Sequence, residues 1–190
     1  MHQVKKSPLE LVRVRIGVSQ SPTLPGQVGL VSFGHFLKGE RVIDVDDFGD
    51  ESYYSWDDFS QLDIATQRKV LDFCIGDKGG FFAPENLNNL PESWYMNHSC
   101  SPNIGFDADD NAVALKDILT GDELVFDYAF AEANPTFSFD CQCGATTCRG
   151  RITGNDWRDL PNISDRYLKS TSMIRGLIEK MHEYEVNPSD

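Results

Sequence analysis

The first 130 residues contain short stretches in which apolar and polar residues alternate, a pattern typical of half-exposed β-strands. The clearest stretch is 11–16, with the sequence LVRVRI. Three further apolar stretches, at 41–45, 112–115 and 124–126, are bounded by Gly, Asp and Asn, which favour turns. The pattern therefore predicts a mainly β chain, in an α+β arrangement of short strands.

One stretch inside this β region has the spacing of a helix instead. The helix is predicted over about residues 61–74, and Ser60 can cap its N-terminus. Its apolar positions include Ile64, Leu71 and Cys74.

A second helix is predicted near the end of the printed sequence, over about residues 164–185. Ser164 can cap it, and Asp165 suits its first turn. Apolar residues recur near helical spacing at Leu168, Ile174, Ile178 and Met181. Since there is no internal repeat, we expect one domain followed by a helical tail.

The composition limits the location of the protein. With 190 residues, 40% of them apolar, the chain can form one compact domain with a core. No early basic segment leads into an apolar run, and no window approaches the roughly 20 apolar residues of a membrane helix. We therefore expect an intracellular protein without membrane contact, in either the cytoplasm or the nucleus.

The chain is strongly acidic, with 30 acidic residues against 17 basic ones and a net charge of −13. This balance argues against direct binding to nucleic acid, whose phosphates attract basic patches. It suits a basic partner, such as a peptide rich in Lys and Arg. The alternative is that the acidity serves solubility alone.

Three cysteines, Cys141, Cys143 and Cys148, are spaced as C-x-C-x4-C, which is typical of metal ligands. Zinc prefers thiolate and imidazole ligands, and a closed structural site has four of them. An odd total of 5 cysteines in an apparently intracellular protein weighs against a disulfide framework. The sequence therefore predicts a zinc site that lacks one ligand.

The missing ligand must come from elsewhere in the chain. The candidates are the remaining cysteines and the histidines: Cys74, Cys100, His2, His35, His98 and His182. Cys74 lies on the apolar side of a predicted helix, where a free cysteine behaves as a small buried hydrophobe. Cys100 lies in a polar turn and is the leading candidate.

Three stretches together resemble a known family. They are NHSCSPN at 97–103, GDELVFDY at 121–128 and CQCGATTCRG at 141–150. In this order they resemble the SET-domain protein lysine methyltransferases with a post-SET zinc segment. The resemblance implies a β-clip-like fold of small sheets with a pseudoknot, which would bring the first two stretches together.

The resemblance also implies a division of the chain. A SET domain is expected over 10–130, with a helical insert at about 60–75. A post-SET zinc segment is expected over 137–153, and the C-terminal helix at 163–186 lies outside the resemblance. Cys100 would join Cys141, Cys143 and Cys148 on one structural zinc ion.

Matching positions imply the remaining site residues. Asn97 and His98 match positions that bind the cofactor S-adenosylmethionine, through an amide side chain and main-chain groups. The loop residues Val28, Gly29 and Leu30 would wrap the methionine end of the cofactor.

The matching positions extend to the reaction centre. Tyr128 matches the catalytic tyrosine, which also contacts the cofactor. Phe126 matches a channel position where Phe favours di- or trimethylation, and Tyr95 would either line the substrate channel or merely pack. The expected activity is methyl transfer to a lysine side chain of a histone or another protein.

Two residues depart from the family pattern. Gln27 replaces the first glycine of a Gly-x-Gly loop, and Val45 stands where a channel tyrosine is common. These departures leave open a second interpretation, in which the chain is a weakly active or inactive binding module that retains the SET fold. The presence of Asn97, His98 and Tyr128 favours the enzyme.

Overall fold

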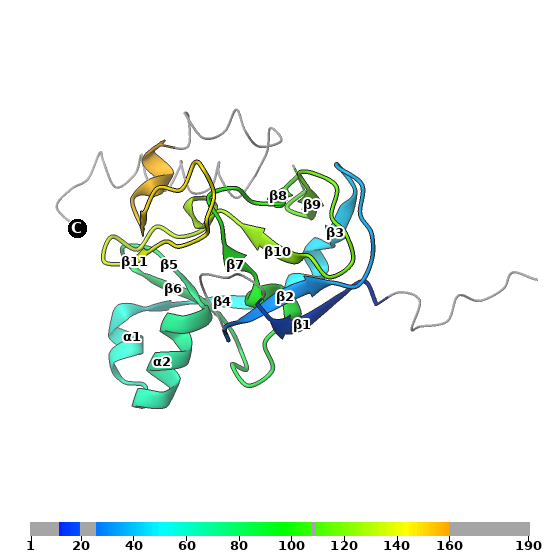
Figure 1. Cartoon of the computed structure of the whole chain (residues 1–190). Helices are drawn as coiled ribbons and strands as arrows, with labels where there is room; N and C mark the ends of the chain where they lie inside the picture. The colour runs from blue at the N-terminus through cyan, green and yellow to red at the C-terminus, as the bar shows by residue number, and fades with distance from the viewer. Residues whose placement is uncertain (1–11, 20–25, 108, 160–190) are drawn as a thin grey trace, which may run out of the picture.

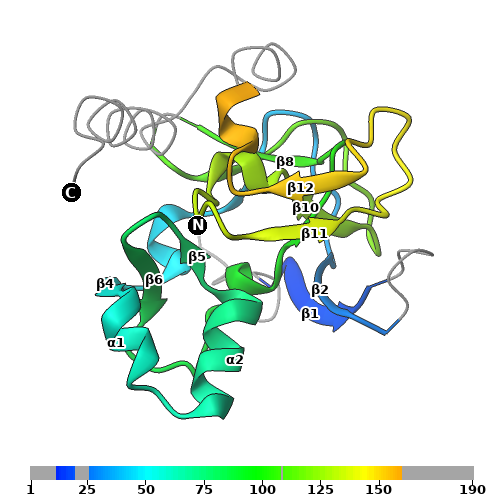
Figure 2. The same cartoon turned by 90° about the vertical axis from the view of Figure 1, so that its left-hand side faces the viewer.

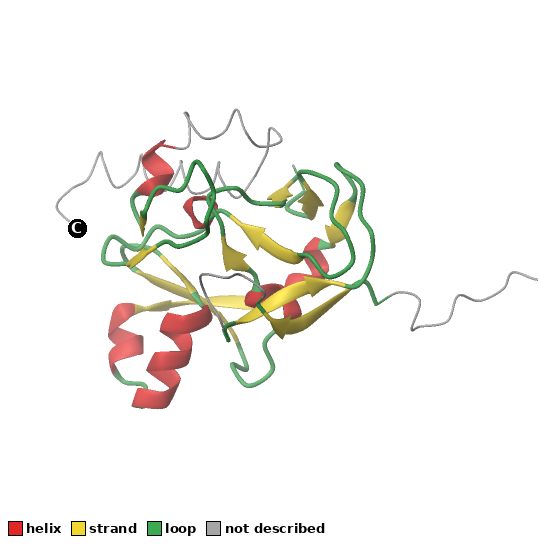
Figure 3. Cartoon of the chain, in the orientation of Figure 1, coloured by secondary structure: helices red, strands yellow, loops and turns green. Residues whose placement is uncertain are grey.

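The computed structural model describes residues 12–19, 26–107 and 109–159. Short strands dominate these residues, and the two α-helices lie together at one corner of the molecule (Figure 1, Figure 3). The prediction of a mainly β fold of small sheets is therefore confirmed. The helix predicted at 164–185 lies outside the described residues.

The largest sheet brings distant parts of the chain side by side. Its strands have the order β1 (Val14–Val18), β2 (Val28–Ser32), β10 (Glu123–Phe126) and β7 (Asn97–His98). β1, β2 and β10 pair antiparallel, whereas β10 and β7 pair parallel, with Phe126 opposite His98. The two sequence stretches at 97–103 and 121–128 therefore meet, as expected.

Three smaller sheets surround this one (Figure 2). One contains β3 (Arg41–Ile43), β9 (Ala112–Ala114) and β8 (Ile104–Phe106). Another contains β4 (Glu51–Ser55), β6 (Gly80–Pro84) and β5 (Ile75–Gly76). The third is the antiparallel pair β11 (Ser138–Asp140) and β12 (Arg151–Thr153). Short 3-10 helices connect the strands: η2 (Val45–Phe48), η3 (Glu92–Tyr95), η4 (Tyr128–Phe130) and η5 (Asp156–Asp159).

The predicted strands at 41–45, 112–115 and 124–126 correspond to β3, β9 and β10. The stretch predicted at 11–16 corresponds to β1, which is shifted toward the C-terminus. β1 begins at Val14 because its pairing partner β2 ends at Ser32.

The main core lies between the sheets. It contains fully buried apolar side chains from several strands and loops: Leu30, Phe36, Ile104, Ile118 and Leu124. Each such side chain contributes about 1.5–3 kcal/mol through the hydrophobic effect. Leu30 of β2 lies opposite Leu124 of β10, so this core fixes the register of β10, the strand that precedes Tyr128.

The helical insert consists of α1 (Trp56–Ser60) and α2 (Ile64–Phe73). The expectation that Ser60 caps one helix over 61–74 is wrong, because Ser60 ends α1 and Asp63 caps α2. The Asp63 carboxylate accepts hydrogen bonds from the backbone N–H groups of Ala65 and Thr66, at 3.0 and 3.1 Å. These are donors that the first turn of a helix leaves unpaired.

The insert has its own aromatic core, formed by rings from α1 and from two strands: Tyr54, Trp56, Phe59 and Phe81. α2 contacts it through the buried Val70 and the half-buried Cys74. Two apolar positions singled out in the sequence do not pack there, since Ile64 is 82% and Leu71 is 60% exposed. Among the described residues, no helix has both the length and the apolar character needed to cross a membrane.

Candidate active site and metal centre

Four cysteines from two separate segments meet in the structure. Cys100 follows β7, Cys141 follows β11, and Cys143 and Cys148 lie in the loop before β12. Their Sγ atoms all lie within 4.8 Å of one another, and those of Cys100 and Cys141 are 3.9 Å apart. The structure thus groups the four residues that the sequence had singled out and leaves Cys74 in the insert.

The cluster fits a tetrahedral zinc ion. Zn–S bonds of about 2.3 Å in a tetrahedron place the sulfur atoms about 3.8 Å apart. Burial raises the pKa of the Cys100 thiol to about 11, and burial also raises that of Cys141. Such thiols ionise readily only beside a cation, so the donor set and its burial both suit a bound metal.

Local backbone geometry turns the loop around the sulfur atoms. Gly144 and Gly150 have φ values of +71° and +76°, a left-handed conformation that glycine adopts without strain. The backbone N–H groups of Arg149 and Gly150 donate to the sulfur atoms of Cys100 and Cys148, each at 3.4 Å. The hydrogen bond from Arg149 lowers the pKa of the Cys100 thiol, against the larger effect of burial.

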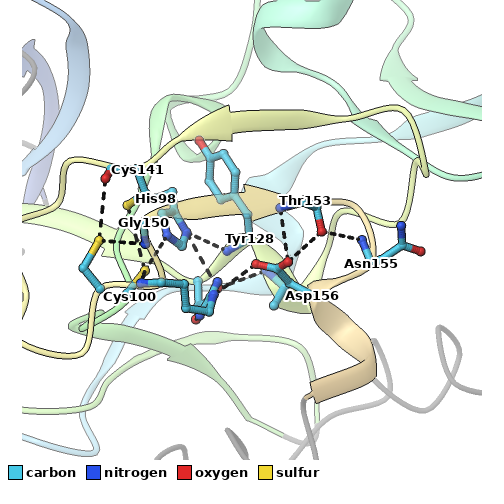
Figure 4. Close-up of polar contacts among 12 residues, drawn as sticks. His98, Cys100, Tyr128, Cys141, Gly150, Thr153, Asn155 and Asp156 are labelled. Carbon is cyan, nitrogen blue, oxygen red and sulfur yellow. Dashed lines mark hydrogen bonds and ion pairs between the residues drawn. The ribbon is translucent and has the colours of Figure 1, made fainter.

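Tyr128 lies at the start of η4, directly after β10. Its hydroxyl donates to the Met96 carbonyl oxygen at 3.1 Å. Its backbone N–H donates to Nδ1 of His98 at 3.1 Å (Figure 4). Burial, and then the charges of Glu132 and Glu123, raise the pKa of the phenol. The hydroxyl therefore stays protonated near neutral pH and serves as a hydrogen-bonding group.

The His98 side chain is buried between Tyr128 and the cysteine cluster (Figure 4). Its Nε2 atom lies 3.3 Å from Sγ of Cys100. Burial lowers the pKa of the imidazole to about 4, against the opposing effect of Asp127, so the ring is neutral at pH 7. Because the imidazole faces the cysteines, only the main chain of His98 is left for the cofactor role implied by the resemblance.

The predicted cofactor residues meet beside β10. The expectation that Val28, Gly29 and Leu30 form a loop is wrong, because they are the first residues of strand β2, which pairs with β10. The Asn97 side-chain amide donates to the Val28 carbonyl oxygen at 3.0 Å and to Oε1 of Glu123 at 2.8 Å. A Cβ atom at Gly29 would lie 2.5 Å from that Glu123 oxygen, so a larger residue there would have to displace the Glu123 carboxylate from Asn97. The Leu30 side chain, in contrast, is in the main core.

Glu123 was not singled out from the sequence, although it lies within the stretch at 121–128. Its carboxylate accepts hydrogen bonds from Asn97 and from the Ser19 hydroxyl. It therefore connects β10 to the neighbouring β7 and to the residue that follows β1. An acidic residue at the start of an otherwise apolar strand is the signal that could have identified it.

A cavity of about 490 Å³ opens on one side of Tyr128. Phe126 and Val45 line it, together with Phe106 and Phe137. Tyr95 is not among its lining residues, and its ring packs against Phe73 with the centroids 5.2 Å apart. The cavity is thus lined by two predicted site residues, Phe126 and Tyr128, and by Val45, which stands where the family commonly has a tyrosine.

The charges around this cavity are all negative. Its described lining includes four carboxyl groups and no basic side chain, the acidic residues being Glu51, Asp72, Asp110 and Glu132. Glu132 is only 6% exposed and accepts backbone hydrogen bonds from Gly76 and Asn134, at 3.1 and 2.8 Å. Burial raises its pKa to about 7, although those hydrogen bonds lower it.

A buried ion pair ties β10 to the cysteine-rich segment. Asp127 is fully buried, and both of its carboxylate oxygens accept hydrogen bonds from the guanidinium of Arg149, at 2.6 Å each. Nε of Arg149 contacts Asp156 at 3.0 Å. Asp127 also caps η4 by accepting from Ala129, the kind of local contact that the sequence suggested. The pairing with Arg149 was missed because 21 residues separate them.

A second cavity, of about 540 Å³, lies around Arg13, Arg41 and Asp44. It contains none of the predicted site residues. We therefore place the candidate site at Tyr128, between the smaller cavity and the cysteine cluster.

Comparison with known proteins agrees with this geometry. The family model described as "SET domain" matches residues 27–129. The chain is 36% identical over 86 residues to the methyltransferase flvH of Aspergillus flavus, covering 44% of this chain and 48% of that protein. It is 37% identical over 62 residues to histone-lysine N-methyltransferase 2D of Homo sapiens, covering 29% of this chain and 1% of that protein.

A third relative is the H3 lysine-4 specific histone-lysine N-methyltransferase of Schizosaccharomyces pombe. It is 41% identical over 65 residues, covering 30% of this chain and 7% of that protein. The matched regions thus span about half of the Aspergillus protein and a small part of the other two.

Proposed function

This chain belongs to the SET domain family, and we propose that it is an S-adenosylmethionine-dependent protein lysine N-methyltransferase. The observation that carries the proposal is the parallel pairing of β7 with β10. It sets Asn97 beside the start of β2, and β10 continues through Asp127 to Tyr128, whose ring lines an apolar cavity with acidic groups around it.

The cofactor site is proposed at Val28, Gly29, Asn97 and the main chain of His98. Asn97 and the neighbouring backbone would bind S-adenosylmethionine, which supplies a methyl group on an electrophilic sulfonium. Leu30 would contribute only its backbone, since its side chain is in the core. The four clustered cysteines would hold a structural zinc ion, with no part in the chemistry.

The cavity supports a lysine as the second reactant. A lysine has an ordinary pKa near 10.4, and its amine must lose a proton before it can attack a methyl group. Phe126 and the other aromatic lining residues desolvate the amine, which disfavours the ammonium form. The protonated Tyr128 hydroxyl would then orient the neutral amine in line with the methyl group.

The charge of the chain supports a basic protein or peptide as the substrate. The net charge is −13, and the described lining of the cavity includes four acidic residues and no basic one. Two relatives are named for histone lysines, which makes histones the first candidates to test. The apparent KM for such a peptide should rise with salt, because added ions screen the attraction. A KM that does not respond to salt would exclude this means of recruitment.

A second candidate function is a binding module that has the SET fold but no turnover. Gln27 and Val45 favour it, because they replace a loop glycine and a channel tyrosine. A channel wall without that hydroxyl has one group fewer to orient an amine.

Binding and transfer, measured separately, distinguish the two functions. We expect calorimetry to detect S-adenosylmethionine binding, and labelled methyl groups to appear on a mixed histone and protein substrate. Tyr128→Phe should lower kcat about a hundredfold while the Kd for cofactor changes less than threefold, because only alignment is lost. The matched control is Tyr54→Phe, whose ring stacks on Phe81 in the insert. Cofactor binding without transfer to any substrate would instead establish the binding module.

A further inference from the structure

The His98 imidazole bridges the cysteine cluster and Tyr128, and the proposed reaction makes no use of it. One ring nitrogen accepts the Tyr128 N–H at 3.1 Å, and the other lies 3.3 Å from Sγ of Cys100 (Figure 4). The side chain is almost entirely buried. Because both ring nitrogen atoms have a partner, the His98 side chain connects the cysteine cluster to the backbone at Tyr128.

The direction of the two hydrogen bonds follows from their donors. A backbone N–H can only donate, so Nδ1 of His98 must present its lone pair to Tyr128. A neutral imidazole then carries its proton on Nε2, which points to Cys100. A metal-bound thiolate is a strong acceptor for that proton. The orientation of the His98 imidazole therefore depends on whether Cys100 is a metal-bound thiolate.

A second connection runs from the same sulfur atom to the residue before Tyr128. The Arg149 backbone N–H donates to Sγ of Cys100 at 3.4 Å, and the Arg149 guanidinium binds Asp127 through two hydrogen bonds. Both ends of the Asp127–Tyr128 dipeptide are thus anchored to Cys100, one through His98 and the other through Arg149.

We propose that His98 is a positioning residue that couples the metal centre to the orientation of Tyr128. The consequence for catalysis rests on the proposed function, in which Tyr128 aligns the amine. A misplacement of about 1 Å at such a group costs on the order of a hundredfold in rate. Metal bound at the cysteines would, through His98, hold the tyrosine in its working position.

The competing explanation is that His98 only fills space. Its ring packs edge-on against Tyr128 and Phe139, with centroids 5.3 and 5.7 Å away. Packing alone does not depend on which nitrogen donates. Two amide substitutions separate these explanations, because each one preserves a different hydrogen bond.

In His98→Asn, the side-chain oxygen takes the position of Nδ1 and can still accept the Tyr128 N–H, but nothing reaches Cys100. In His98→Gln, the amide nitrogen reaches toward Cys100, but the acceptor for Tyr128 is lost. The control is His35→Asn, at an exposed histidine away from this network.

The test measures zinc release to a chelator, and hydrogen exchange of the Tyr128 amide by NMR, in the full chain. In the unchanged protein, removing zinc should speed exchange at Tyr128 about tenfold. His98→Gln should release zinc at a rate within threefold of the unchanged protein, but exchange Tyr128 about tenfold faster. His98→Asn should release zinc about tenfold faster, but exchange the Tyr128 amide within threefold of the unchanged protein. In this variant, zinc removal should no longer affect the exchange of the Tyr128 amide.

Activity adds a third measurement. His98→Gln should lower kcat about tenfold with KM within threefold, since alignment rather than binding is lost. If both variants alter zinc release and exchange alike, or neither variant alters them, the coupling is wrong and His98 only packs. If the coupling is found without methyl transfer to any substrate, the proposed function fails while the coupling stands.

Discussion

The helical insert and the cysteine-rich segment both extend from the central sheets, yet they are held by different forces. The insert, α1 and α2, packs Val70 and two aromatic rings of its own against two further rings from β4 and β6. The segment from β11 to β12 has one fully buried apolar side chain, Ile152, beside its cysteines. A short segment with so little apolar surface to bury needs a metal or ion pairs for its stability. The insert should therefore respond to packing mutations and the segment to metal removal.

The largest effect is expected from removing a metal ligand. Cys141→Ser should abolish zinc binding and remove hydrogen-exchange protection from residues 137–153, because binding free energies of about 10–16 kcal/mol are coupled to folding at such sites. Native mass spectrometry would measure the zinc content. Cys74→Ser, in the insert, should leave the zinc content unchanged. Equal zinc loss in both variants would contradict the division between the two regions.

A packing mutation beside the insert should lower the stability of the protein without changing its zinc content. Phe81 is 2% exposed and lies at the centre of the aromatic cluster, so Phe81→Ala should lower the free energy of unfolding by about 3–5 kcal/mol. Zinc content should stay unchanged in the fraction that remains folded. Urea unfolding would measure the change, with Leu71→Ala on the exposed face of α2 as the control, expected within about 0.5 kcal/mol.

A smaller effect is expected where the cysteine-rich segment meets β10. Arg149→Met leaves the Asp127 carboxylate buried without its cation, which should cost about 2–3 kcal/mol, because the arginine is itself only partly buried. The matched control is Arg151→Met, whose pair with Asp140 is exposed and should contribute less than about 1 kcal/mol. Thermal unfolding of both variants tests the difference, and equal losses would contradict it.

The smallest effect concerns Glu132, which joins the end of the insert to the segment after Tyr128. Its pKa rises from an ordinary 4.5 to about 7 in the folded state. The folded state therefore keeps a proton that the unfolded state loses between these values, so stability falls as pH rises from 4.5 to 7.

Between pH 5 and 7.5, the unchanged protein should lose roughly 2 kcal/mol more stability than Glu132→Gln. Urea unfolding at several pH values gives the two slopes, and only the difference between them is interpreted. Parallel slopes would mean that Glu132 ionises in the folded state as it does in solvent.

The sequence predicted most of the strands and the grouping of the four cysteines, because local patterns carry both. The strands β3, β9 and β10 follow from apolar stretches bounded by turn residues. The cysteine cluster follows from ligand spacing and from one further cysteine in a polar turn. The fold class follows from three stretches that resemble one family, and the family match agrees with it.

The errors arise where two patterns fit the same residues. Ser60 and Asp63 are both good helix caps, and the capping box at Ser55 starts a separate helix that the periodicity did not distinguish. The apolar Ile64 and Leu71 suggested a buried face, but α2 packs through Val70. Which side of a short helix is buried depends on its neighbours, and the aromatic partners of α2 come from β4 and β6 as well as α1.

What the sequence determined by itself was which chemical groups are available: four thiols at metal-ligand spacing, an amide, a glycine and a tyrosine near aromatic residues. What only the tertiary structure decided was how these groups are connected. The pairing of β7 with β10, the ion pair of Asp127 with Arg149 and the bridge through His98 all join residues from separate segments. Residue types and their spacing record what a side chain can bind. Its actual partner depends on where the packed core brings distant strands together, and local patterns do not contain that information.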